Sequence, residues 1–128
     1  MLQVYSNNLT FVDEAAAPLN NVAIQKGCTA VLGAPATIEL NKAGVYMVCC
    51  DVAATAGTGT VQMYKDGVAQ PFAKAIIDAD SGSFTTLVQV KENNCNCCCL
   101  TSATTLQFIV DSTADITGDI NVTVTKIC

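Results

Sequence analysis

The sequence predicts an all-β protein, an antiparallel sandwich or barrel of about eight to ten short strands. Two observations carry this prediction. Short runs of alternating apolar and polar residues recur along the chain, and turn residues separate them. No long window shows the three- and four-residue apolar spacing of an amphipathic helix. The length of 128 residues is that of a single domain with its own core.

The predicted strands begin close to the N-terminus. Leu2 and Val4 alternate with polar residues and start the first strand, and Leu9 and Phe11 indicate another short strand. Further strands are expected at Asn21–Gln25, Thr29–Leu32, Thr37–Leu40 and Gly44–Ala54. The Gly44–Ala54 run is apolar on both faces, which indicates a central strand covered on both sides. The small residues of Ala53–Thr60 indicate a loop after it.

The second half of the chain continues the same pattern. Lys65-Asp66-Gly67 is typical of a hairpin turn. The aspartate-rich run Asp111–Asp119 predicts a solvated turn. Around these turns, strands are expected at Thr60–Lys65, Pro71–Ile77, Ser83–Val90, Thr104–Val110 and Ile120–Ile127.

Composition and charge exclude several classes of function. Hydrophobic residues make up 51% of the chain and charged residues 13%, which excludes intrinsic disorder. No apolar run approaches the roughly 18 residues of a membrane span. The basic residues are six lysines and the net charge is −5, so we expect no nucleic-acid partner. Histidine is absent and no residue set combines base, nucleophile and oxyanion site, so we expect no catalytic residues and no enzyme activity.

The order of these elements resembles a known family, the tumour-necrosis-factor/complement-head jelly roll. Leu19–Asp51 resembles its first half, in which a Gly-x-Tyr motif opens a central core strand, here Gly44 and Tyr46. The hairpin VQMYKDGV and the last three predicted strands resemble the remainder, although VTVTKIC replaces the aromatic-rich closing strand of complement-head members. The resemblance implies a jelly-roll sandwich over residues 19–128, preceded by an N-terminal strand or attachment segment over residues 1–18, and a compact homotrimer.

The same resemblance implies a structural role. Similar short domains occur in bacteriophages as head fibres or capsid decoration proteins, and others cap collagen-like filaments on bacterial surfaces. We therefore expect a virion protein made in the host cytoplasm, because the N-terminus lacks the basic and apolar regions of a signal peptide. Its expected partners are itself, capsid or other virion proteins, and a host surface glycan or protein. The alternative is a trimeric binding head, lectin-like or receptor-engaging, on a bacterial surface filament.

Two groups of residues are candidates for assembly. The N-terminal residues Leu2, Val4 and Tyr5 are expected to attach the domain to a shell or stalk. A second group lies on apolar strand faces and is expected in the core or at the trimer interface. Its members are Tyr46, Val48, Cys50, Phe108, Val122 and Val124.

Eight cysteines are the most unusual feature of the composition, and three interpretations of them remain open. Thiolates bind zinc and other soft metals, so Cys95, Cys97, Cys98 and Cys99 are a candidate metal site, and no other cofactor is expected. Disulfide bridges from this cluster to Cys28, Cys49 or Cys128 are the second interpretation. The third is that the cysteines are free and packed as small hydrophobic residues.

Overall fold

The structure, a computed structural model, describes residues 1–33, 36–91 and 104–128. The secondary structure of these ranges is β throughout, in eight strands. They are β1 (Leu2–Phe11), β2 (Asn21–Gln25), β3 (Ala30–Gly33), β4 (Thr37–Leu40), β5 (Gly44–Lys65), β6 (Val68–Asp78), β7 (Gly82–Val90) and β8 (Thr104–Lys126). The described ranges contain no helix that is long and apolar enough to cross a membrane.

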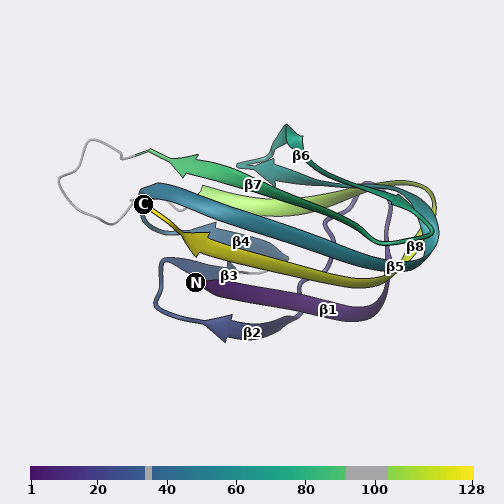
Figure 1. Cartoon of the computed structure of the whole chain (residues 1–128), viewed down its shortest axis with the longest axis horizontal. Helices are drawn as coiled ribbons and strands as arrows, with labels where there is room; N and C mark the ends of the chain where they lie inside the picture. The colour runs from purple at the N-terminus through teal and green to yellow at the C-terminus, as the bar shows by residue number, and fades with distance from the viewer. Residues whose placement is uncertain (34–35, 92–103) are drawn as a thin grey trace.

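The strands form two layers joined by a long ribbon of β5 and β8 (Figure 1). The first half of β5 pairs with β7 and with the last half of β8, which in turn pairs with β1. This layer, sheet I, has the order β2-β1-β8-β5-β7. The other halves of the ribbon pair with β6 and β4, giving sheet II in the order β6-β5-β8-β4-β3. The predicted antiparallel jelly-roll sandwich is therefore confirmed.

The prediction of a loop at Ala53–Thr60 and a turn at Asp111–Asp119 is wrong, because β5 and β8 run through these two segments. The segments face each other, and their pairing shifts register at three places between Ala54 and Gly59. Such irregularities bend a strand and strengthen its twist. The ribbon can therefore pass from one sheet to the other without a loop, and Figure 1 shows it curving at the end opposite the two termini.

The N-terminal residues belong to the same layered structure as the rest of the chain. β1 is an inner strand of sheet I, with β2 on one side and β8 on the other. The following segment pairs with the sheet II half of β8. There the Ala17 amide donates to the Phe108 carbonyl at 2.7 Å, and the Val110 amide donates to the Ala15 carbonyl at 3.0 Å.

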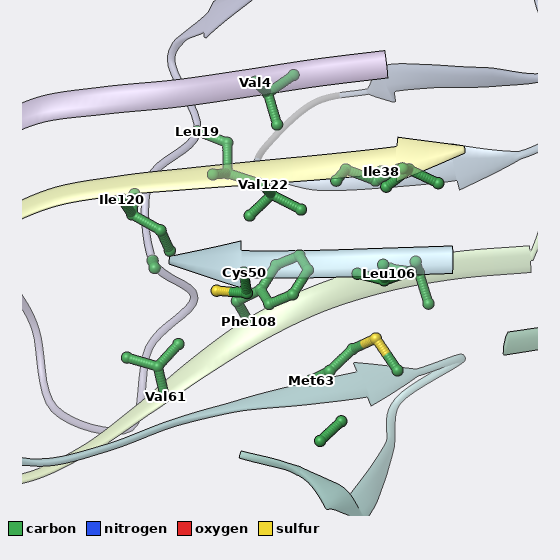
Figure 2. Packing of buried hydrophobic residues seen from close by; sticks show 14 of the residues in the cluster. Val4, Leu19, Ile38, Cys50, Val61, Met63, Leu106, Phe108, Ile120 and Val122 are labelled. Carbon is green, nitrogen blue, oxygen red and sulfur yellow. The ribbon is translucent and has the colours of Figure 1, made fainter. Parts of the chain in front are cut away.

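The core lies between the two sheets. Figure 2 shows side chains of both layers pointing into this space, among them Val4 and Val122 from sheet I and Met63 and Leu106 from sheet II. Tyr46 is fully buried, and its hydroxyl donates a 2.6 Å hydrogen bond to the Lys42 carbonyl. No buried side-chain nitrogen or oxygen of the described residues lacks a hydrogen-bond partner. The core is thus apolar with its few polar atoms satisfied.

Candidate functional site

The outer face of sheet I carries two neighbouring rows of uncharged side chains across its strands. One row consists of Gln3, Thr123, Cys49 and Thr85, and the next consists of Thr125, Met47 and Leu87. We call these seven residues the assembly face. Leu87 is 56% exposed and Met47 is 36% exposed, so large apolar groups meet solvent there. The assembly face has no charge to keep it hydrated.

A second apolar surface lies on β6, which among the described strands pairs with β5 alone. Phe72 is 64% exposed and Ile76 is 73% exposed, and both point away from the core. Lys74 lies between them on the same side of the strand. We call Phe72, Lys74 and Ile76 the edge patch. Outward apolar residues on an edge strand are an aggregation hazard when they stay exposed, so the edge patch is a candidate contact surface.

The residues predicted for the core or trimer interface all lie in the core. Tyr46, Val48, Cys50, Phe108, Val122 and Val124 are fully buried within the single chain. Their side chains therefore do not face a neighbouring subunit. On the outer face of sheet I, the exposed large apolar residues of β5 and β7 are Met47 and Leu87. The sequence pattern separates the two faces of Gly44–Ala54 but, since both are apolar, does not say which one is outside.

The predicted attachment residues differ from one another in burial. Leu2 and Val4 are fully buried, so the expectation that they bind a shell or stalk is wrong. Tyr5 alternates with them, is half-buried and faces outward on sheet I. Of the three, only Tyr5 is placed to contact another molecule.

The cysteines fall into two sets. Cys95, Cys97, Cys98 and Cys99 lie outside the described residues, and the metal site there stays a prediction. The other four are free thiols, of which Cys28 and Cys128 are exposed, Cys49 is half-buried and Cys50 is buried. Within residues 1–33, 36–91 and 104–128, no group of three or more cysteine and acidic side chains could hold a metal ion.

The free thiols should differ sharply in reactivity. Burial raises the pKa of the Cys50 thiol, and the negative charge of Asp51 and the neighbouring Cys49 raise it further. Because the thiolate is the nucleophile, maleimide at neutral pH should alkylate the exposed Cys28 and Cys128 and leave Cys50 unmodified until urea is added. Peptide mapping by mass spectrometry checks this. Equal labelling of Cys50 and Cys28 in the folded protein would contradict the core position of Cys50.

A polar hollow of about 320 Å³ lies at one end of the outer face of sheet I, next to the assembly face. Three of its lining residues lie side by side on neighbouring strands: Tyr5 on β1, Asn121 on β8 and Asp51 on β5. We call this hollow the polar trough, and it is lined by Gln3, Tyr5, Asn7, Asp51, Ala53, Asp119, Ile120 and Asn121. A smaller hollow shares Asp51 and Ala53 with it and extends it toward Ser83 on β7.

Comparisons of the sequence find no matching family model and no similar curated protein. Comparison of the structure gives clear matches. The PRD1 vertex protein P5 is 14% identical at a TM-score of 0.69, with 99% of this chain and 96% of that chain covered. The globular domain of zebrafish complement 1qA protein is 8% identical at a TM-score of 0.70, with the same two coverages. The chain has the tumour-necrosis-factor/complement-head jelly-roll fold.

A tumour-necrosis-factor relative supports the same assignment. Murine APRIL is 11% identical at a TM-score of 0.61, with 98% of each chain covered. The resemblance inferred from Gly44 and Tyr46 is therefore confirmed at the level of the fold. In this jelly roll Gly44 begins β5, and Tyr46 points from β5 into the core. At these identities the likeness establishes the fold alone.

Proposed function

We propose that this chain is a structural virion protein of a bacteriophage, a head fibre or capsid decoration protein that assembles as a homotrimer. Its mechanism is assembly, without catalysis. The likeness over nearly the whole chain to a phage vertex protein supports the virion location. The observation that carries the proposal is the uncharged assembly face with its exposed Met47 and Leu87.

The chemistry of the assembly face is that of a subunit contact. Soluble monomers usually keep roughly a quarter to a third of their surface residues charged. Homo-oligomer interfaces are depleted in charge and more apolar than ordinary surface. Seven neighbouring side chains with no charge match the second description. Covering them with another subunit removes Met47 and Leu87 from water.

A closed ring of three subunits needs two different complementary surfaces, since each contact is head-to-tail. We assign the assembly face to one side of that contact and the edge patch to the other. Phe72 and Ile76 of one subunit would then cover Met47 and Leu87 of the next.

Acidic substitutions on the assembly face test the proposed contact. Replacing both Met47 and Leu87 with aspartate would bury unpaired charge, which costs about 3 kcal/mol or more. We expect the affinity between subunits to fall at least about 100-fold, so that the trimer dissociates. Phe72→Asp should act in the same direction from the other side. Sedimentation velocity gives the oligomeric state and circular dichroism checks the fold.

A matched control is available at Val12. It is 67% exposed and lies outside both the assembly face and the edge patch, so Val12→Asp should leave the trimer intact. If the Met47 and Leu87 variant stays trimeric while folded, the assembly face is not the contact. If Val12→Asp dissociates the trimer as well, added charge alone explains the effect.

The virion location needs its own test. Phage particles purified from a lysate should contain the chain in constant ratio to the capsid protein, measured by quantitative mass spectrometry. The gene should also lie beside genes for capsid and portal proteins. A chain found on bacterial surface filaments and absent from particles would overturn the virion location and favour the alternative of a trimeric binding head.

A further inference from the structure

We propose that the polar trough of sheet I is a binding site for a neutral saccharide. This inference goes beyond assembly, because it gives the chain a ligand. It begins from three side chains with unused hydrogen-bonding capacity. Within residues 1–33, 36–91 and 104–128, the Tyr5 hydroxyl, the Asn7 amide and the Asp51 carboxylate have no hydrogen-bond partner.

The trough is built from strands, which hold its side chains in place. Tyr5, Asn121 and Asp51 are register partners on β1, β8 and β5, so neighbours in this row are spaced by the width of a strand, about 4.8 Å. Two further contacts fix the lining. Gln3 Nε2 donates to Asn121 Oδ1 at 3.3 Å, and the backbone N–H of Asn8 donates to Asp119 Oδ1 at 2.8 Å. A ligand therefore meets groups that are already oriented.

The first of these contacts also sets the chemistry of Asn121. Because its Oδ1 accepts from Gln3, its Nδ2 group remains to donate into the trough. Asn7 and Tyr5 can donate too, whereas Asp51 and Asp119 can only accept when ionised. The lining thus offers donors and acceptors side by side.

This mixture selects among ligand classes. A sugar hydroxyl both donates and accepts, so it can use both kinds of group at once. A metal ion or an ammonium group would use only the acceptors. An anion, such as an acidic sugar, would face Asp51 and Asp119 with no lysine among the lining residues. A neutral polyhydroxylated ligand therefore uses the trough most fully, and the ring of Tyr5 offers an apolar face to the C–H side of a sugar.

The dimensions agree with this ligand class. A volume of about 320 Å³ lies at the small end of the range for ligand sites, roughly 300–1,000 Å³. The adjoining hollow at Ser81, Gly82 and Ser83 opens from the same Asp51 carboxylate. One sugar unit in the trough could therefore continue along this hollow as part of a longer glycan.

Saturation-transfer difference NMR tests the site with the full chain and four probes, the methyl glycosides of glucose, galactose, mannose and N-acetylglucosamine. At least one probe should give transfer signals, and Asp51→Ala should weaken its binding at least tenfold. Tyr5→Ala should weaken it as well. Asp111→Ala is the matched control, since Asp111 is an exposed aspartate on the sheet II half of β8 and should leave binding unchanged.

Three outcomes would overturn the proposal. One is the absence of transfer to all four probes, and another is binding that Asp51→Ala leaves intact. The third is a calcium titration that perturbs the Asp51 and Asp119 resonances while no glycoside does, which would assign the trough to a cation. The monomeric Met47 and Leu87 variant keeps every trough residue, so repeating the titration on it separates failure of the saccharide site from failure of the trimer.

Discussion

An alanine in place of Gly57 is expected to lower the free energy of unfolding by roughly 3 kcal/mol or more, or to prevent folding. Gly57 lies where β5 bends between the sheets. Its φ of +99° is one that residues other than glycine rarely adopt. An added Cβ would lie 2.2 Å from the Asp115 carbonyl oxygen and 2.4 Å from the Ile116 Cα. Both atoms are backbone of the facing strand β8, so relief of the clash requires the ribbon to separate.

Urea denaturation measures this loss, and Gly27→Ala is the matched control. Gly27 also has a positive φ, +74°, but a Cβ there would meet no atom within 4 Å. Its substitution should cost only the backbone strain, about 1 kcal/mol. Similar losses at both positions would contradict a close approach of the two strands at the bend.

Truncation of Phe108 to alanine should cost about 3–5 kcal/mol, as expected for an aromatic ring removed from a packed core. Phe108 is fully buried on the sheet II half of β8. Its ring stacks on that of Phe84 from β7 in sheet I, with 6.2 Å between centroids. The cavity left by the truncation would therefore lie between the layers, where both sheets lose a partner.

Phe72→Ala removes the same side chain from an exposed position and serves as the control. Both substitutions should be made in the background of the monomeric Met47→Asp, Leu87→Asp variant. Phe72 is part of the edge patch, so in a trimer its truncation would also change stability through assembly. In that background Phe72→Ala should change the free energy of unfolding by less than about 0.5 kcal/mol. Equal effects of the two truncations would refute the packing between the sheets.

The strands were predictable because alternation records which side chains enter the core. The Gly44–Ala54 run was correctly expected to be central, and it lies in β5 between β7 and β8. The expectation that both of its faces are covered is wrong within the chain, because Met47 and Asp51 are exposed on the outer face of sheet I. The bend was not predictable from local pattern. Ala53–Thr60 and Asp111–Asp119 lack steady alternation and resemble loops, yet each remains a strand because the other pairs with it from far along the chain.

The candidate site was less accessible to sequence reasoning for a related reason. Which face of β5 is buried depends on its register with β7 and β8, and no local residue encodes that register. The polar trough combines Tyr5, Asp51 and Asn121, which lie far apart in the sequence on three neighbouring strands. No spacing motif connects them, so only the folded arrangement brings their polar groups together.

Native mass spectrometry of the purified chain, recorded without reductant, is the most direct test of the proposed assembly. The account predicts a species with the mass of three chains at micromolar concentration. It also predicts that the Met47 and Leu87 variant gives the mass of one chain under the same conditions. A wild-type chain that is monomeric at this concentration would contradict an autonomous homotrimer held together by the assembly face.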